Sequence, residues 1–203
     1  MTQYKTLAQS VYEELKRKIL SKEYDANEHV SEKSIAAQLN VSKTPVREAL
    51  NQLCQEGYIT RYPSFGYIIK DLSYQEVKDI FELRYILETA AIRLVIRYAK
   101  DEEIRTLYDY MGSSEDSVTD GYGKNTRFHW ELGKLTGNAY LANDILHLAM
   151  SIARPSKYLD SGDNRKPSMD FHVDIINALL ARDIDVAIAY LKKDILTGEH
   201  REC

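Results

Sequence analysis

The sequence predicts a mainly α-helical protein with one small β-hairpin: an N-terminal winged helix-turn-helix domain followed by a C-terminal all-α helical bundle. Two observations lead to this fold class. Apolar residues recur at helical spacing through most of the 203 residues. The strand-like runs YITRY and YIIKDL flank the turn sequence PSFG, as in a hairpin. Because the capping sequence SYQE then begins a long helix, we expect domains at residues 1–71 and 72–203.

The first domain is predicted to run helix, helix, turn, helix and hairpin. The first helix is expected over about residues 6–21, and the sequence DANEHV follows as a turn in which Asn27 can take a left-handed conformation. Ser31 can cap the second helix, EKSIAAQL. The third helix is expected to begin at Pro45, with Thr44 as its N-cap, since proline is tolerated at the first helical position.

The second domain shows helical periodicity almost throughout. Two polar segments, GSSEDSVTDGYG and PSKYLDSGDNRKP, are expected to be loops. The predicted helices cover residues 73–98, 101–111, 124–136, 139–154, 168–182 and 184–196.

Composition narrows the class of protein. Hydrophobic content of 44% and charged content of 29% are typical of a globular protein, and no apolar run approaches the roughly 18 residues that a membrane span needs. The N-terminus has no apolar core of a signal peptide. The two cysteines, Cys54 and Cys203, cannot form a disulfide framework, so we expect a cytoplasmic protein that does not bind membranes.

Charge is distributed unevenly along the chain. Residues 1–70 hold 10 Lys and Arg against 8 Asp and Glu, whereas the remaining residues hold 17 against 23. The net charge is therefore +2 in the first part and −6 in the second. A basic head on an acidic body is consistent with a DNA-binding module joined to a module of another function.

The sequence VSKTPVREAL places several phosphate-binding groups at the start of the third helix. Free backbone N–H groups and the helix dipole favour phosphate there, and the hydroxyls of Ser42 and Thr44 and the ammonium of Lys43 can add to this. Arg47 can donate a fork of two hydrogen bonds to guanine. The alternative is that the hydroxyls only cap the helix and that Arg47 pairs with a neighbour on its own helix, such as Glu48.

The segment SEKSIAAQLNVSKTPVREALNQLCQEGYITRYPSFGYII resembles the DNA-binding domain of the GntR family of bacterial transcriptional regulators. The remainder is similar to the FadR subfamily, whose ligand-binding domain is a helical bundle. The stretches FELRYILETAAIRL, NTRFHWELGKLTGN and DFHVDIINALLARDIDVAIAYLKKD fall in order at the family's spacing. The compact second domain looks more like the shorter, VanR-like branch with an FCD-type effector domain.

The resemblance implies a ligand-responsive regulator, most commonly a repressor, that binds a near-palindromic operator in double-stranded DNA as a homodimer. The family usually has Pro-Gly where Ala26 and Asn27 stand, and often arginine where Lys43 stands; lysine favours phosphate contact over two-pronged base recognition. Carried over by position, the implied DNA contacts are Lys33, Ser42, Lys43, Thr44 and Arg47, with Ser64 and Gly66 in the wing near the minor groove.

In relatives an Asp and three His residues bind a divalent metal. The corresponding positions here are Asn125, His129, His172 and Asp194. Amide, imidazole and carboxylate donors suit Zn, Mn or Ni. The alternative is a polar pocket without metal, in which both histidines are hydrogen-bonded within the bundle.

The family often turns basic residues toward the cavity to meet an acidic effector. Arg84 and Arg154 are the residues that the resemblance suggests for a carboxylate effector. For Arg84 the alternative is an ion pair with Glu88, one helical turn later.

Two other classes of function remain open from the residues alone. A metal site in a helical bundle could belong to a metal-dependent enzyme, but no further nucleophile or carboxylate lies beside the suggested ligands, so we expect no enzyme. A ligand-binding protein with a vestigial DNA-binding head is the other alternative, and the intact SKTPVREAL argues against it.

Overall fold

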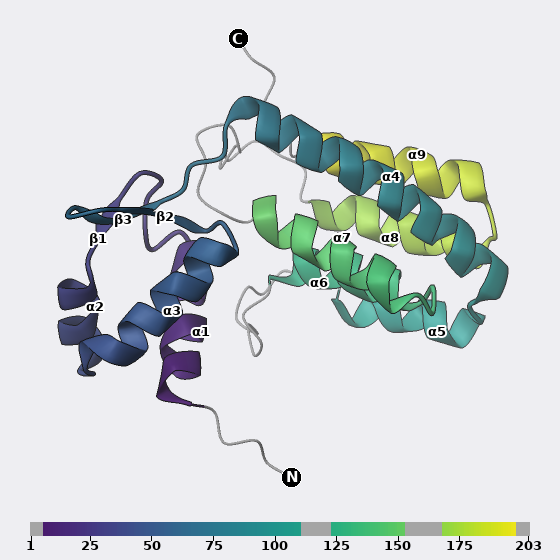
Figure 1. Ribbon diagram of the computed structural model, residues 1–203. Coiled ribbons are helices and arrows are strands. Elements are labelled where there is room, and N and C mark those ends of the chain that lie inside the picture. Colours follow the sequence, from purple (N-terminus) through teal and green to yellow (C-terminus); the bar gives the residue numbers. More distant parts are fainter. Residues whose placement is uncertain (1–5, 111–122, 153–167, 198–203) are drawn as a thin grey trace. The chain divides into compact units, whose positions relative to one another are not determined.

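The computed structural model describes residues 6–110, 123–152 and 168–197. These residues are mainly α-helical, with one small antiparallel sheet, and the predicted fold class is confirmed (Figure 1). The chain divides into two compact units, of which the first ends at Leu72 and the second begins at Ser73.

The first unit is a winged helix-turn-helix. Its elements follow one another as α1 (Leu7–Leu20), β1 (His29–Val30), α2 (Glu32–Leu39), α3 (Lys43–Gln55), β2 (Ile59–Tyr62) and β3 (Gly66–Ile69). Helix α1 packs against α3. Their apolar faces bury Leu15, Ile19, Leu50 and Leu53, which form the core beneath the exposed face of α3.

The predicted hairpin is confirmed and gains a third strand. The sheet order is β1-β3-β2, all antiparallel, and Ile68 of β3 pairs with His29 on one side and Thr60 on the other. Strand β1 has only two residues, too few for an alternating pattern, and was not predicted. Asn27 has a φ of 66°, as expected. Its N–H donates to the Ile69 carbonyl of β3 at 3.0 Å, and this hydrogen bond positions the chain just before β1.

Helix α3 begins earlier than predicted. Lys43 is its first residue and Ser42 stands at the N-cap position without a capping side-chain hydrogen bond, so the prediction of Thr44 as N-cap was wrong. Pro45 is the third helical residue. Because the first four N–H groups of a helix have no acceptor within it, a proline there loses no hydrogen bond.

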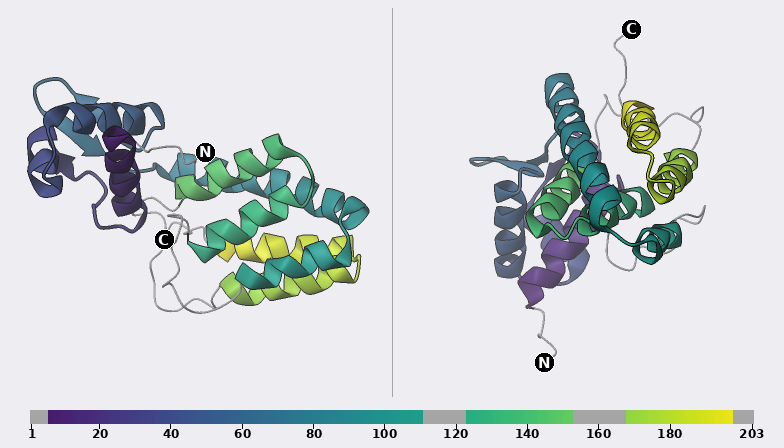
Figure 2. Two further views of the ribbon diagram at one scale, coloured as in Figure 1. Left: turned by 90° about the horizontal axis from the view of Figure 1, so that it is seen from below. Right: turned by 90° about the vertical axis from the view of Figure 1, so that its right-hand side faces the viewer.

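The second unit is a helical bundle (Figure 2). It consists of α4 (Tyr74–Tyr98), α5 (Asp101–Arg105), the 3-10 helix η1 (Thr106–Tyr110), α6 (Lys124–Lys134), α7 (Ala139–Ile152), α8 (Ser168–Leu180) and α9 (Ile184–Thr197). Helices α6 and α7 pack together, as do α8 and α9, and α4 contacts both pairs. The helix predicted over 101–111 changes to a 3-10 turn after Arg105.

Helix α4 is held at both ends. At its start the predicted capping box is present: Glu76 accepts from the Ser73 N–H at 2.9 Å, and the Ser73 hydroxyl accepts from the Glu76 N–H at 3.2 Å. At its end Arg182 donates to the carbonyls of Ile96 and Ala99. These contacts fix the helix that carries Arg84 and Glu88. None of the helices in the described ranges is long and apolar enough to cross a membrane.

Candidate functional site

The side chains predicted to contact DNA lie on α2, at the start of α3 and in the wing. All of them are exposed except Gly66, which is half-buried. At the start of α3 the unpaired N–H groups and the dipole present positive charge, beside the exposed Lys43. This end of α3 therefore has the chemistry of a phosphate-binding surface.

Arg47 has a partner that neither sequence alternative named. Its Nε and Nη2 donate to the two carboxylate oxygens of Glu32 on α2, at 2.9 and 2.8 Å. The hydroxyl of Tyr67 on β3 donates to the same carboxylate at 3.3 Å. The hydrogen bonds from Arg47 lower the pKa of Glu32, so the carboxylate is charged at neutral pH. Glu32 lies 15 positions before Arg47, beyond the reach of helical spacing rules.

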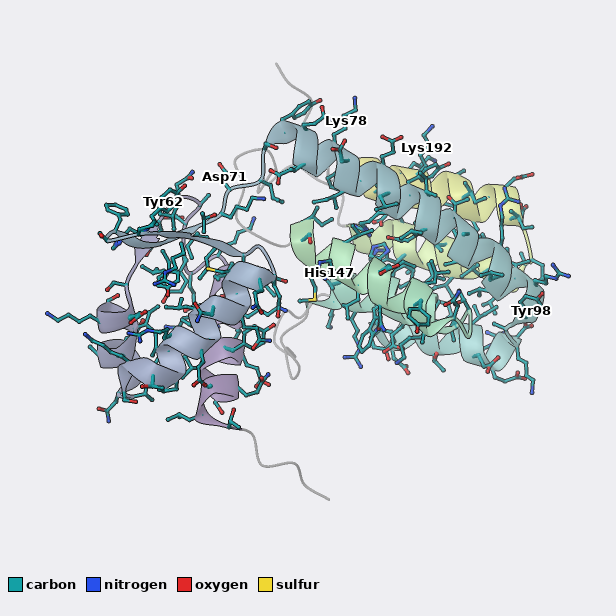
Figure 3. The ribbon with its side chains drawn as sticks, viewed as in Figure 1. Tyr62, Asp71, Lys78, Tyr98, His147 and Lys192 are labelled. Atoms are coloured by element: carbon teal, nitrogen blue, oxygen red, sulfur yellow. The ribbon has the colours of Figure 1, made fainter. Side chains whose placement is uncertain are left out.

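The wing turn has a fixed backbone. Ser64 and Gly66 have φ angles of 63° and 114°. A Cβ on Gly66 would lie 2.8 Å from His29 Nε2 and 3.0 Å from the Val30 carbonyl oxygen, so only glycine fits. His29 Nε2 also bonds the carbonyl of Phe65, and the two rings meet edge to face. Phe65 in this turn is exposed, as is Tyr62 just before it, which Figure 3 labels.

Five charged or polar side chains form a buried cluster in the second unit. They are Arg84 and Glu88 of α4, His129 of α6, His172 of α8 and Asp194 of α9, and each is at most 6% exposed. Asp194 Oδ2 lies 3.2 Å from His129 Nε2, and its Oδ1 lies 3.4 Å from His172 Nε2. Four helices therefore bring their polar groups to one place in an otherwise apolar core.

Glu88 connects the two predicted sites. Arg84 Nε donates to Glu88 Oε1 at 2.8 Å, which confirms the predicted ion pair. Glu88 Oε2 lies 2.6 Å from His129 Nδ1, a contact that was not predicted. The buried positions of α4 include 77, 81, 84, 88, 92 and 95. That periodicity was visible in the sequence and placed Glu88 on the core side of the helix.

The cluster sets the charge of its members. Burial opposes the charges of Glu88 and Asp194, but Arg84 and His129 together outweigh it at Glu88, and the two histidines together outweigh it at Asp194, so both pKa values are lowered. Burial also opposes a charge on His129, but the carboxylates of Glu88 and Asp194 together outweigh it and raise the pKa. Burial lowers the pKa of His172, which is therefore neutral.

His129, His172 and Asp194 have the donors that a divalent metal needs. Each offers one ligand atom, and the three atoms lie within 4.8 Å of one another. Nε2 of both histidines faces the carboxylate of Asp194, at 3.2 and 3.4 Å, without the geometry of a good hydrogen bond. Glu88 orients the His129 ring from its other nitrogen, and the Phe128 ring stacks on His172 at 3.9 Å. Nitrogen and carboxylate ligands of this kind suit Zn, Mn or Ni.

The remaining predicted residues do not all join this cluster. Asn125 lies one turn before His129 on α6, but it is exposed, and its role as a ligand stays a prediction. Arg154 lies outside the described residues. Two further histidines were not predicted as ligands. His147 is exposed on α7, as Figure 3 shows, and His200 lies outside the described residues. Nη2 of Arg84 is buried, without a hydrogen-bond partner among the described residues.

Comparison with known families divides the chain in two. A model described as "Bacterial regulatory proteins, gntR family" matches residues 7–69, and the model of the FCD domain matches residues 79–196. The first match covers the winged unit, and the second covers the bundle with its buried cluster.

Similar proteins are named as regulators. The chain is 32% identical to the Nta operon transcriptional regulator of Aminobacter aminovorans over 176 residues, which cover 85% of this chain and 83% of the relative. It is 29% identical to the HTH-type transcriptional repressor NanR of Salmonella newport over 209 residues, covering 90% and 80%.

Solved structures share the fold. Escherichia coli McbR/YncC aligns with a TM-score of 0.73 at 18% identity, covering 95% of both chains. A GntR-type regulator from Rhodococcus sp. RHA1 aligns with a TM-score of 0.73 at 19% identity, covering 94% of both. At these identities the likeness concerns the fold alone.

The buried cluster predicts a window of pH in which it stabilises the metal-free protein. Glu88 and Asp194 have lowered pKa values, so their contribution is present above about pH 4 and is lost as the pH falls. His129 has a raised pKa, so its contribution is present below about pH 6.5 and is lost as the pH rises through the folded-state value.

We therefore expect Asp194→Asn to lower the free energy of unfolding by about 3 kcal/mol near pH 6, and by less near pH 9. Urea unfolding in the presence of a chelator measures this. The exposed Asp144 on α7 provides the control Asp144→Asn, for which we expect no such pH dependence. A stability loss for Asp194→Asn that is equal at all pH values would contradict the charge assignment.

Proposed function

Because the chain belongs to the GntR family of bacterial regulatory proteins and carries an FCD domain, we propose that it is a ligand-responsive repressor that binds a near-palindromic operator as a homodimer. It is a transcriptional regulator with an effector-binding domain. The matched families and the named relatives are regulators and not enzymes, so the metal-dependent enzyme is not supported. The name of NanR as a repressor supports repression, and we place the protein in the cytoplasm, where bacterial operators lie.

The observation that carries the DNA-binding proposal is the exposed, cationic start of α3. Lys43 and Arg47 lie in its first two turns, beside backbone N–H groups that favour phosphate. Thr44 and Ser42 are exposed on the same turn, and Lys33 is exposed on α2. This arrangement also argues against a vestigial head, because a surface without a ligand has no need of such a group of donors.

The wing supplies the second proposed DNA contact. Ser64 and Gly66 lie in a turn with positive φ angles, and His29 and Val30 leave no room for a Cβ at Gly66. His29 also bonds the carbonyl of Phe65 within this turn, and a turn held in this way would lose little conformational entropy when it enters a groove of DNA. We therefore assign Ser64 and Gly66 to contacts near the minor groove.

The proposed effector is a small organic acid that binds in the bundle. Arg84 offers a buried guanidinium whose Nη2 has no acceptor in the described ranges, and a carboxylate is the natural partner for it. Arg154 is proposed as a second basic contact. Because the cluster draws on α4, α6, α8 and α9, a ligand there would bias the packing of four helices, which is a physical basis for changing operator affinity.

We propose that His129, His172 and Asp194 hold a divalent ion, with Asn125 as a fourth ligand. Such an ion would compensate the buried carboxylate and offer a coordination position to an effector carboxylate. The donor set fits Zn, Mn or Ni.

The homodimer is supported by apolar side chains on the outer face of α4. Leu83 and Ile86 are 45% and 55% exposed, three residues apart and therefore on one face of the helix. Burying such side chains in a second copy removes apolar surface from water. Two DNA-binding units on adjacent half-sites would also match a near-palindrome.

For DNA binding, we expect Arg47→Ala to cost about 1–3 kcal/mol on the operator and to relax preference at one base pair in each half-site. Lys43→Ala should weaken binding to all DNA sequences alike, because a lysine acts as a point charge on phosphate. The slope of log affinity against log salt concentration, the salt slope, should fall by about one. Fluorescence anisotropy on a duplex selected from a random library, and on its single-base variants, measures both. Equal losses on all sequences for both variants would remove Arg47 from the base contacts.

For assembly, we expect wild-type protein to sediment as a dimer at micromolar concentration. Ile86→Glu should shift it toward monomer, because a buried unpaired charge would oppose the interface. Val173→Glu, at an exposed position on α8, is the matched control and should leave the dimer intact. A wild-type monomer that binds a palindrome one to one would refute the homodimer.

For the metal, we expect added Zn, Mn or Ni to raise the melting temperature of chelator-treated protein, and Asp194→Asn to abolish this effect. Asn125→Asp should tighten binding about tenfold or more if residue 125 is a ligand, since a carboxylate binds cations better than an amide does. Asn143→Asp, which adds the same charge at an exposed position of α7, should have no effect. Protein without stoichiometric metal by elemental analysis, and without stabilisation by any of the three ions, would mean a metal-free pocket.

A further inference from the structure

The ion pair between Glu32 and Arg47 leaves part of the guanidinium available. Arg47 uses Nε and one Nη2 hydrogen to bind the carboxylate side-on, at 2.9 and 2.8 Å. A guanidinium has five N–H donors, so three remain. One Nη1 hydrogen and the second Nη2 hydrogen form a parallel fork at the far end of the group. That fork has the spacing needed for O6 and N7 of guanine.

Glu32 is the anchored member of this pair. Its side chain is 20% exposed, whereas that of Arg47 is 57% exposed. The carboxylate also accepts from the hydroxyl of Tyr67, a buried residue of β3. The arginine therefore projects from a carboxylate that is held by α2 and β3. A side-on contact with two bonds fixes the plane of the guanidinium as well as its position.

Glu32 also changes how Arg47 acts on the phosphate backbone. Because the two charges are in contact, their pair is nearly neutral at a distance, and the exposed cations of the same unit include Lys33, Lys43 and Arg61, whose charge also acts on Glu32. Phosphate contacts add affinity for every sequence, whereas base contacts distinguish between sequences. An arginine that is oriented and neutralised in this way adds little to the affinity for phosphate but can still contact a base.

We propose that Glu32 is a positioning residue for operator recognition: it holds the guanidinium of Arg47 in the orientation for reading guanine and keeps its charge from strengthening binding to unrelated DNA. The inference rests on the proposed DNA-binding function. Its consequence is that Glu32, although it is an anion at a DNA-binding surface, increases the ratio of specific to non-specific binding.

The test replaces Glu32 by Gln, which keeps the size of the side chain and removes its charge. Two duplexes serve as probes: one selected by the wild-type full-length protein from a random library, and one of the same composition in shuffled order. We expect Glu32→Gln to tighten binding to the shuffled duplex about threefold to tenfold and to steepen its salt slope by about one. The ratio of specific to non-specific affinity should fall about tenfold or more.

Three further variants separate positioning from fold stability. In an Arg47→Ala background, Glu32→Gln should no longer change base preference, because the group that it orients is gone. Tyr67→Phe removes the hydrogen bond from the Tyr67 hydroxyl to the Glu32 carboxylate without changing any charge. It should therefore lower base discrimination while leaving the salt slope unchanged. Glu48→Gln removes a charge from the exposed residue next to Arg47 and should leave the affinity ratio unchanged.

The outcomes are distinguishable. If wild-type protein selects no duplex from the library, the proposed DNA-binding function fails. If it does select one, and Glu32→Gln weakens both duplexes equally or changes neither, the positioning role is refuted. Thermal unfolding of each variant accompanies the binding curves, and a Glu32→Gln protein that melts with the wild type yet loses discrimination supports the proposal.

Discussion

The second unit depends on the requirement that buried charges be compensated. Glu88 is the residue at which this requirement is met, because it accepts from Arg84 at 2.8 Å and lies 2.6 Å from His129. Without it, the guanidinium of Arg84 in the apolar core would have no counter-charge in direct contact among the described residues. Asp194 fulfils the same role for His129 at the other ring nitrogen, and it also contacts the neutral His172. The packing of α4, α6, α8 and α9 is therefore constrained by polar geometry as well as by apolar burial, and ligand chemistry at this point would reach all four helices.

The same physical device recurs at the surface of the first unit, with a different energetic weight. Glu32 orients Arg47 as Glu88 orients His129: a carboxylate from one helix fixes the functional group of another. In the bundle the pair is buried, so removing one partner is costly to the fold. On the winged unit the pair is largely in water, where such contacts add little to stability. The value of Glu32 therefore lies in orientation and charge balance during recognition.

Two ways of compensating the buried carboxylates follow from the geometry of the cluster. One is a proton on His129, which makes Arg84, Glu88, His129 and Asp194 sum to no net charge while His172 stays neutral. The other is a divalent ion bound through the histidine nitrogens and Asp194. Because metal ligation requires an unprotonated nitrogen, the two forms exclude each other at His129 Nε2. If a metal binds there, the protonation state of the His129 imidazole would connect the stability of the bundle to metal binding.

The sequence by itself determined the two-part architecture, the capped starts of α2 and α4, the hairpin, the Arg84–Glu88 pair and the family resemblance. All of these depend on contacts within a few residues or on short motifs, where spacing dictates proximity. Tertiary structure decided the two-residue strand β1 and the start of α3 at Lys43. It also decided three contacts: the ion pair of Glu32 with Arg47, the contact of Glu88 with His129, and the contacts of Asp194 with both histidines. Apart from the start of α3, these features join residues between 15 and 65 positions apart. Helix packing sets such distances, and no local pattern encodes which two side chains will face each other across a core.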